Sequence, residues 1–319
     1  MREVQVTASD GLWSIGELAE RGGVTVKTVR FYSDRGLLPE RVRSAGGHRR
    51  YGPDALDRLR LIRSLRALDL PVPEVRRIVD DEAGAGGALE DAVAGQLRQL
   101  GDRMAALRWR EAGLRLVQEC PPQERADRLR LIGAVTAPPS TAPLARFWRA
   151  WLPPRMSGRA VAAFLEQAVP APPDDPTPAQ VLAFARLHAL VTRPCDGSAR
   201  PRPAAHRSGP GFRPEVLYDG LGEAYELAAA RLRRDRAPHP GEALDCFVAA
   251  YAVSGGARDT PDFRRQLAAH LAADPRLDPY WALTAEVLGP RDGRPVPTPG
   301  TTHDWLLAAL TDEVAARAA

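Results

Sequence analysis

Amphipathic helical segments follow one another through residues 144–319 of this 319-residue chain. In stretches such as SGRAVAAFLEQAV and TPAQVLAFARLHALV, apolar residues recur at positions i, i+3, i+4 and i+7, which is the spacing of one helix face. Prolines and glycines separate these stretches, and no convincing strand pattern occurs between them. The sequence therefore predicts a mainly α fold, with an all-helical C-terminal domain over residues 144–319 that a loop at residues 193–211 interrupts.

A pair of short helices is predicted near the N-terminus. Ser14 stands at a helix start and Glu17 follows three residues later, which is the spacing of a capping box. A glycine pair ends this helix, and Thr25 can cap a second helix that runs to about Arg35. Two short helices joined by a tight glycine turn predict a helix-turn-helix motif.

The stretch PERVRSAGGHRRYG, residues 39–52, follows the second helix. Its glycine pair and β-compatible flanks predict a small hairpin, or wing. Pro53 is well placed at the first turn of a third helix, and Pro73 starts a short fourth one. We therefore expect a winged helix-turn-helix domain over residues 12–82.

Positive charge is concentrated in this N-terminal region. The whole chain carries a formal net charge of only +4, whereas residues 12–79 hold 14 Lys and Arg against 8 Asp and Glu, a net charge of +6. Lys27 is the only lysine, so the many arginines partly reflect a composition bias. A basic module on a near-neutral body indicates local contact with phosphate groups.

Helix geometry divides the stretch VKTVRFYSDRGLL, residues 26–38, into two faces. At about 100° per residue, Val29 and Ser33 share the buried side, whereas Lys27 and Phe31 lie opposite. Tyr32 flanks the core side, so its ring can rest on the core with its hydroxyl outward. An apolar ring exposed on a basic helix face is unfavourable in water, and binding in a DNA groove would bury it. The alternative is that Phe31 packs beneath the wing.

The combination of TVRFY, GLL, a glycine-bearing wing ending in RRY and a later L-P-EV helix resembles the winged helix-turn-helix of the MerR family of bacterial transcription regulators. The resemblance covers nearly all of residues 13–79. His48 departs from the tyrosine common at its position, and Ser33 replaces the usual acidic residue. From the helix faces and the resemblance together, we expect DNA contacts from Thr25, Lys27, Thr28, Arg30, Phe31, Tyr32, Arg43, His48, Arg49 and Tyr51.

A heptad seam is predicted within residues 88–119. Apolar residues there alternate at spacings of four and three over about three heptads, which favours one coiled-coil pairing. An ordinary core helix of the C-terminal domain is the alternative. The family resemblance implies that such a helix pairs antiparallel in a homodimer. The residues of the seam are Val93, Leu97, Leu100, Met104, Leu107 and Leu114.

Residues 120–143 mix one possible helix with two proline clusters and predict a linker. Cys120, Cys195 and Cys246 are far apart and lack C-x-x-C spacing, so we expect reduced, mostly buried thiols. The metal- and redox-sensing members of the MerR family place several cysteines near the end of the dimerisation helix. Cys120 stands there alone, which leaves a metal or redox sensor as a less favoured alternative. No metal site and no cofactor is predicted.

Aromatic residues are spread through residues 144–319, with Trp305 and Tyr280 among them. A helical bundle can enclose an apolar pocket lined by such rings, which indicates a small-molecule sensor. For any single ring, a place in the core is the alternative. The residues expected to bind an effector are Trp148, Trp151, Tyr218, Tyr225, Tyr251 and Trp281.

The sequence and the resemblance together predict a transcriptional regulator that binds promoter DNA as a homodimer. The resemblance implies RNA polymerase as a partner and an effector that changes the spacer DNA between the two polymerase elements. A ligand-independent regulator whose C-terminal domain binds another protein is the alternative. Without H-E-x-x-H, G-x-S-x-G or a glycine-rich phosphate loop, no enzyme is expected. No run of 18 apolar residues occurs, so we expect a cytoplasmic protein without membrane contact.

Overall fold

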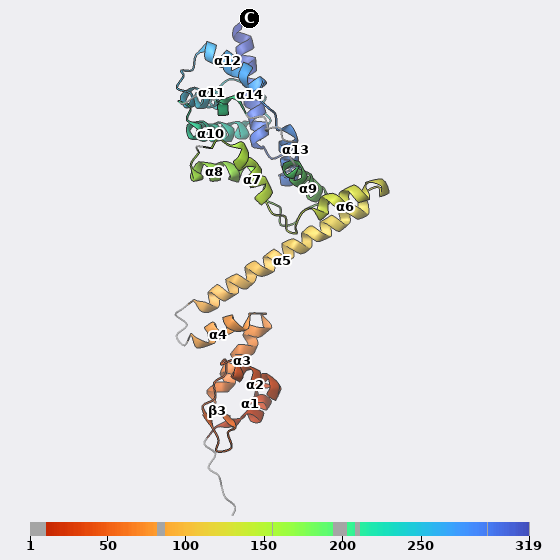
Figure 1. Ribbon diagram of the computed structural model, residues 1–319, viewed down its shortest axis with the longest axis vertical. Coiled ribbons are helices and arrows are strands. Elements are labelled where there is room, and N and C mark those ends of the chain that lie inside the picture. Colours follow the sequence, from red (N-terminus) through yellow and green to blue (C-terminus); the bar gives the residue numbers. More distant parts are fainter. Residues whose placement is uncertain are drawn as a thin grey trace, which may run out of the picture. The chain divides into compact units, whose positions relative to one another are not determined.

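The computed structural model describes residues 11–81, 87–154, 156–193, 203–207, 211–291 and 293–318. It is mainly α-helical with one small sheet near the N-terminus, as the sequence predicts (Figure 1). The chain divides into two compact units, Met1–Arg103 and Met104–Ala319. Each unit has a hydrophobic core of its own.

The N-terminal unit is a winged helix-turn-helix. Its three strands form one antiparallel sheet in the order β1-β3-β2, with Trp13 opposite Tyr51 and Val42 opposite Arg50. Strands β2 and β3 make the predicted wing. The elements are β1 Trp13–Ser14, α1 Ile15–Gly22, α2 Val26–Asp34, β2 Val42–Arg43, β3 Arg49–Tyr51, α3 Asp54–Ala67 and α4 Val72–Asp80.

Local hydrogen bonds set the starts and ends of the first two helices. The capping box is present, because Ser14 donates its N–H to Glu17 Oε2 at 2.6 Å and Glu17 returns its N–H to Ser14 Oγ at 3.3 Å. Gly23 ends α1 in the left-handed conformation, at φ 61°, which favours glycine. Thr25 Oγ1 accepts the Thr28 N–H at 3.1 Å and caps α2. The predicted boundaries of both helices are thus confirmed within about one residue.

Two arginines of α3 hold the N-terminal unit together from within. Arg58 donates Nε to the Leu37 carbonyl at 2.7 Å and a second nitrogen to the Val79 carbonyl at 2.9 Å. Arg63 donates to the Gly22 carbonyl at the end of α1. These contacts satisfy carbonyls that helix and loop ends leave open. Part of the arginine excess of this unit is therefore structural.

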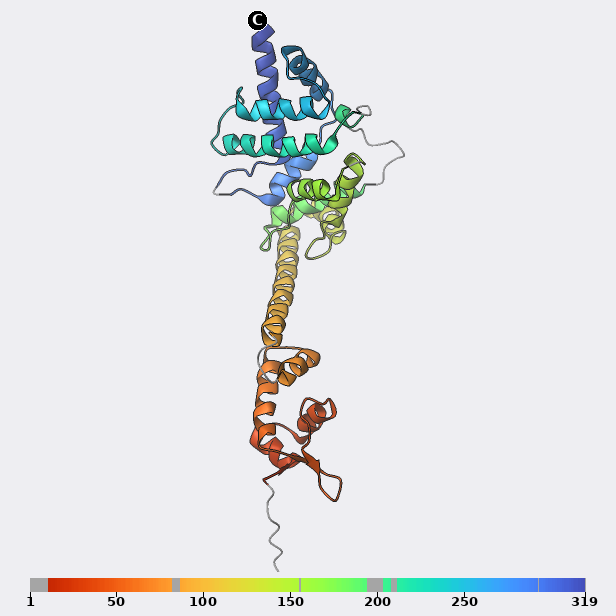
Figure 2. The same ribbon diagram turned by 90° about the vertical axis from the view of Figure 1, so that its left-hand side faces the viewer.

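The C-terminal unit is built from helices alone among its described elements, apart from an isolated bridge between Arg291 and Arg294. Helices α10 and α11 lie side by side, and α14 crosses them (Figure 2). The helix α5, Ala88–Glu119, enters this unit from the N-terminal side. The remaining elements are η1 Pro122–Glu124, α6 Arg125–Gly133, α7 Ala142–Trp151, α8 Gly158–Ala168, α9 Pro178–Thr192, η2 Ala204–Arg207, α10 Pro214–Leu232, α11 Glu242–Ser254, α12 Pro261–Ala272, α13 Asp278–Leu288 and α14 Pro299–Ala318.

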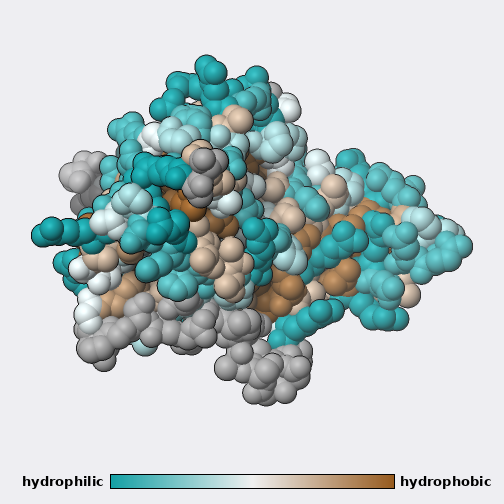
Figure 3. Space-filling model, turned by 90° about the horizontal axis from the view of Figure 1, so that it is seen from above, coloured by the Kyte–Doolittle hydropathy of each residue, from teal (hydrophilic) through white to brown (hydrophobic). Residues whose placement is uncertain are grey.

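Two hydrophobic clusters make the core of the C-terminal unit. One joins α10, α11, α12 and α14 around Phe247 and Leu306, which are fully buried. The other joins the end of α5 to α7, α9 and α13 around Trp148 and Phe184. Seen from the side shown in Figure 3, the surface is mostly hydrophilic and hydrophobic residues show only between hydrophilic ones.

Residues 120–143 are more ordered than a linker requires. Helix α6 packs against α9, and Ile132 and Val135 contact the core that contains Trp148. Part of the expected linker therefore belongs to the C-terminal unit. Most of the loop expected at residues 193–211, including Cys195, lies outside the described residues. Within the part of the chain that the structure describes, no helix combines the length and apolar character needed to cross a membrane.

Candidate nucleic-acid interface and ligand pocket

The exposed face of α2 carries the basic residues that the sequence assigns to DNA. Val29 and Ser33 are buried and Lys27 and Arg30 are exposed, as the helix geometry predicts. In the described part of the chain, neither Lys27 nor Arg30 has an ion-pair partner within 4.0 Å. Both cations are therefore available to an anionic partner.

Phe31 lies on the same exposed face. Its ring meets the Tyr32 ring edge-on at 5.6 Å, and the Arg35 guanidinium lies 5.0 Å from its centroid. The side chain nevertheless remains 42% exposed, which does not fit the alternative of burial beneath the wing. Tyr32 itself is buried against the core. An apolar ring is thus presented to solvent among three basic side chains.

The wing is tied to α2 by an ion pair. Arg49 on β3 lies 2.7 Å from Asp34 at the end of α2 and 3.6 Å from Glu40. Arg43 on β2 donates two hydrogen bonds to Glu40, at 2.9 and 3.0 Å, and these lower the pKa of the Glu40 carboxyl. His48 is exposed near the tip of the wing. Among the predicted wing residues, Arg43 and Arg49 are therefore held by these acids, whereas His48 is not.

Helix α5 uses two faces. The predicted seam residues Leu97, Leu100, Met104, Leu107 and Leu114 are exposed, with Leu114 at 73%, and Val93 is partly buried. On another face, Trp109, Ala112 and Leu116 are buried in the core of the C-terminal unit. Trp109 donates Nε1 to the Pro173 carbonyl at 3.0 Å and meets Phe184 edge-on. The end of α5 is thus anchored while its heptad stripe is left uncovered.

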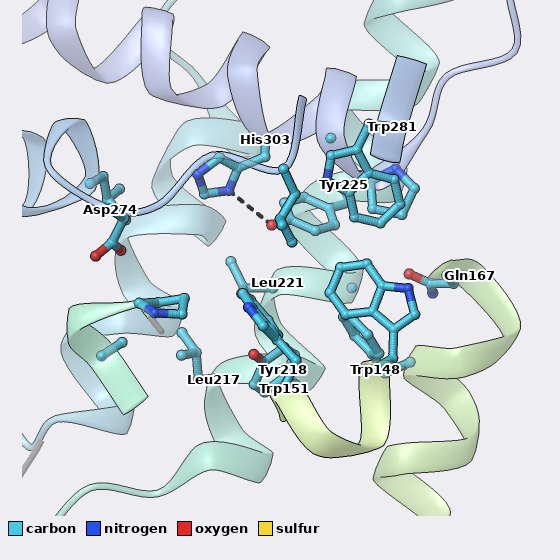
Figure 4. A pocket seen from close by; sticks show the side chains of 18 of the residues that line it. Trp148, Trp151, Gln167, Leu217, Tyr218, Leu221, Tyr225, Asp274, Trp281 and His303 are labelled. Atoms are coloured by element: carbon cyan, nitrogen blue, oxygen red, sulfur yellow. Dashed lines mark hydrogen bonds between the residues drawn. The ribbon is translucent and has the colours of Figure 1, made fainter. Parts of the chain in front are cut away.

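A cavity of about 450 Å³ lies between α7, α8, α10, α13 and α14 of the C-terminal unit. This size is typical of sites for drug-sized ligands. Of the eight aromatic residues considered from the sequence, Trp305 and Tyr280 are core residues that do not line the cavity. The other six all line it, and they are Trp148, Trp151, Tyr218, Tyr225, Tyr251 and Trp281. Figure 4 labels all of these except Tyr251.

Trp148 is the centre of the aromatic side of the cavity. Trp151 and Phe164 approach it at 5.1 Å with interplanar angles of 86° and 70°, and Trp281 lies 5.3 Å from it. Trp281 in turn packs over residue 300, where a Cβ atom would lie 2.2 Å from its Cγ, so glycine is required there. Rings at near-right angles make a corner whose faces a ligand can contact.

Two hydrogen-bonded pairs add polar groups to the cavity. Tyr225 Oη and His303 Nδ1 are 3.0 Å apart, and His206 Nε2 lies 2.6 Å from Tyr218 Oη. Burial lowers the pKa of His303 to about 4, so its imidazole is neutral at pH 7. Burial also raises the pKa of Tyr225 and Tyr218 above the ordinary tyrosine value. Tyr225, Tyr218 and His303 are therefore uncharged hydrogen-bonding partners.

The cavity lining is also acidic, a feature that the sequence reading missed. Arg276 is the only lysine or arginine among the described lining residues, and it lies 3.8 Å from Asp278. Partial desolvation raises the pKa of Asp304, although its side chain reaches the surface. Carboxylates from α10, from the α12–α13 turn, from the start of α13 and from α14 converge only in the fold, so no local pattern marked them. The lining carboxylates are Asp219, Glu223, Glu226, Asp274, Asp278 and Asp304.

Comparison with known proteins identifies the N-terminal domain. The family model described as MerR HTH family regulatory protein matches residues 13–82. Residues 13–82 are a MerR-family helix-turn-helix domain. The expectation drawn from the TVRFY, GLL and RRY motifs is thereby confirmed.

The relatives are similar to only part of the chain. The transcriptional activator TipA of Streptomyces coelicolor is 46% identical over 71 residues, which is 22% of this chain and 28% of TipA. The nodulation protein NolA of a Bradyrhizobium species is 46% identical over 68 residues, 21% of this chain and 29% of NolA. The lead(II) complex of PbrR691 from Ralstonia metallidurans is 35% identical, covering 34% of this chain and 89% of that one, with a TM-score of 0.31. The chain thus spans under a third of the length of TipA and of NolA.

Tyr51 has a structural place in the MerR-family domain. Its side chain is fully buried, and its hydroxyl donates to Ser33 Oγ at 3.2 Å. A buried ring has no surface with which to contact a phosphate, so we correct its expected role from a DNA contact to a support of the wing. Ser33, where the family usually has an acidic residue, supplies the acceptor. Asp34 supplies the carboxylate that pairs with Arg49.

Replacing Tyr51 with phenylalanine is expected to lower the free energy of unfolding by about 1 kcal/mol, because one buried hydrogen bond is lost. DNA affinity measured below the unfolding transition should stay within about twofold of wild type. Denaturant titration and fluorescence anisotropy measure the two quantities. Ser33→Ala and the double variant complete the cycle, and a tenfold loss of DNA affinity at unchanged stability would contradict the structural role.

Proposed function

We propose that this chain is a DNA-binding transcriptional regulator that binds promoter DNA as a homodimer and responds to a small-molecule effector. The observation that carries the proposal is the exposed basic face of α2 within a MerR-family domain. The protein is proposed to act in the cytoplasm, without catalysis of its own. Its proposed activity is to bind DNA and to change the geometry of that DNA complex when the effector binds.

The DNA contacts are proposed to come from α2 and the wing. Lys27 and Arg30 are exposed and can reach phosphates or base edges in a major groove. Phe31 offers an apolar ring for a thymine methyl or a sugar. Arg43 and His48 on the exposed part of the wing are suited to the DNA backbone. Arg49 can add to this contact while its pair with Asp34 holds the wing beside α2.

The homodimer is proposed to form through the uncovered stripe of α5. Five of its six large apolar side chains are exposed in the single chain, which is unfavourable in water for so long a helix. Antiparallel pairing of two such helices would bury the stripes against each other. It would also place two recognition helices on one DNA duplex, related by a two-fold axis.

Effector sensing is proposed to use the cavity of the C-terminal unit. Trp148 lines the cavity and belongs to the same hydrophobic cluster as Trp109 of α5. A ligand that moves Trp148 therefore acts on the cluster that anchors α5. In a dimer, a change in α5 alters the angle between the two DNA-binding domains and so strains the spacer DNA for RNA polymerase.

The alternative functions have less support. Exposed aromatic residues would favour a C-terminal domain that binds another protein. The six predicted rings instead line a cavity. A metal or redox sensor would rely on Cys120, which is buried and donates its thiol to the Val117 carbonyl at 3.3 Å. Among the described residues, no group of three or more His, Cys, Asp or Glu is placed to hold a metal ion.

Selection of DNA from a random duplex library by the full-length chain tests the proposed function. We expect an inverted repeat to be enriched, because a two-fold dimer reads two related half-sites. The enriched duplex should then be protected against nuclease by the wild-type chain. Enrichment of no sequence, or of a single half-site bound by monomers in light scattering, would contradict the proposal.

A further inference from the structure

The charge of the ligand pocket is strongly negative. Among the described lining residues, six carboxylates face the single guanidinium of Arg276, which lies near Asp278. Asp219, Glu223, Glu226 and Asp304 have no lysine or arginine of the described chain within ion-pair distance. Such a lining repels an anion and raises the local concentration of a cation.

The carboxylates are not spread evenly over the pocket. Asp219, Glu223 and Glu226 are spaced by four and three residues, so they follow one face of α10. Asp274 lies on the side of the pocket away from Trp148 and Gln167 (Figure 4). The three carboxylates of α10 and that of Asp304 are exposed at the rim, whereas Trp148 is buried and Trp151 and Trp281 are partly buried. The pocket therefore combines an apolar end with an acidic rim.

The aromatic end can itself recognise positive charge. Trp151, Phe164 and Trp281 pack around the buried Trp148, and these three partly buried rings line the cavity, where a ligand can contact them. The negative face of an aromatic ring attracts a cation, most strongly for tryptophan, and this is how proteins recognise quaternary ammonium groups. Nearby Tyr225 and His303 are uncharged and add no positive charge to oppose such a ligand.

The size of the cavity sets the kind of cation. A volume of about 450 Å³ fits an organic molecule of drug size rather than a bare inorganic ion. We propose that the effector of this pocket is an organic cation with an aromatic or branched apolar body, its body against Trp151 and Trp281 and its charge near the carboxylate rim. This inference rests on the proposed sensor function and names the chemical class of its ligand.

Two probe ions of the same shape and opposite charge test the ligand class. Tetraphenylphosphonium and tetraphenylborate are titrated into the full-length chain, with tryptophan fluorescence and the unfolding temperature as readouts. The phosphonium is expected to quench fluorescence, raise the unfolding temperature and bind at least tenfold tighter than the borate. Its affinity should fall with added salt, since part of it is electrostatic.

Variants assign the binding to the pocket. Asp304→Asn combined with Glu226→Gln is expected to weaken phosphonium binding about tenfold, and Trp151→Ala to weaken it at least as much. Asp312→Asn is the matched control, because Asp312 is exposed on α14 and does not line the cavity. Equal weakening by Asp312→Asn would overturn the assignment to this site.

The outcomes separate the ligand class from the proposed function. Equal or tighter binding of the borate overturns the cation proposal and leaves the pocket as an effector site. Binding of neither ion also overturns the cation proposal. In either case, a gel shift of the selected DNA by the same preparation shows whether the DNA-binding function stands. A phosphonium that binds as expected and also changes the DNA complex supports both.

Discussion

Replacing Arg264 with alanine is expected to lower the free energy of unfolding by about 3 kcal/mol. Arg264 is only 8% exposed, and it donates to Asp259 at 2.7 and 2.9 Å, to Asp245 at 2.8 Å and to Glu313 at 2.7 Å. Glu313 is buried as well, so the variant leaves its carboxylate without its main partner. Arg317 lies 2.5 Å from the other Glu313 oxygen and remains in the variant. The expected loss of unfolding free energy is therefore near the lower end of the range for breaking a buried ion pair.

The neighbouring Arg265 provides a matched control. It is exposed and pairs only with Asp262, three residues earlier on the same helix, among the described ion pairs. Exposed pairs of this kind contribute about 0–1 kcal/mol, so Arg265→Ala should change stability little. Denaturant titration of the full-length chain measures both variants. Equal losses for the two arginines would contradict the buried network.

The contribution of Arg264 should also depend on pH. Its hydrogen bonds lower the pKa of Asp259 below the ordinary value of 3.8. A carboxylate with a lowered pKa in the folded state stabilises the fold above its ordinary pKa, and this stabilisation is lost as pH falls through the folded-state value. The stability difference between wild type and Arg264→Ala should therefore narrow below a pH of about 4.

Replacing Arg30 with alanine is expected to weaken binding to the selected DNA by about 1–3 kcal/mol. Arg30 is exposed on α2 and has no ion-pair partner in the described chain, so its removal takes away a DNA contact without disturbing the fold. Lys27→Ala should weaken binding to all sequences alike and reduce the slope of affinity against salt by about one. Fluorescence anisotropy over a range of salt concentrations measures both effects.

Arg49 should behave differently from Arg30. Arg49→Ala is expected to abolish the specific gel shift, because it removes the pair with Asp34 and so frees the wing from α2. Arg60→Ala is the matched control, because Arg60 is exposed on α3 and pairs only with Asp57 among the described residues. Specific binding retained by both Arg30→Ala and Arg49→Ala would rule out this face as the DNA-binding surface.

The helix-turn-helix was predictable because its signals are local. Ser14 with Glu17, and Thr25 with Thr28, make hydrogen bonds within one helical turn, so residue type and spacing suffice to place them. Val29 and Ser33 face the core because a helix turns by a constant angle. The exposed apolar stripe of α5 followed from the same periodicity. Trp109, Ala112 and Leu116 form a second stripe at helical spacing, which the heptad seam obscured.

Sites built from residues that are far apart in the sequence were harder to predict. The sequence alone indicated a mainly helical chain, the DNA-binding motif and an aromatic-rich C-terminal domain, because periodicity, capping and motif spacing act over a few residues. The tertiary structure alone decided that six scattered aromatic rings share one cavity, that its rim is acidic and that Tyr51 is buried. It also separated Arg30, which faces solvent, from Arg58 and Arg264, which hold the fold. Identical side chains differ in role because burial and partners come from chain segments that only folding brings together.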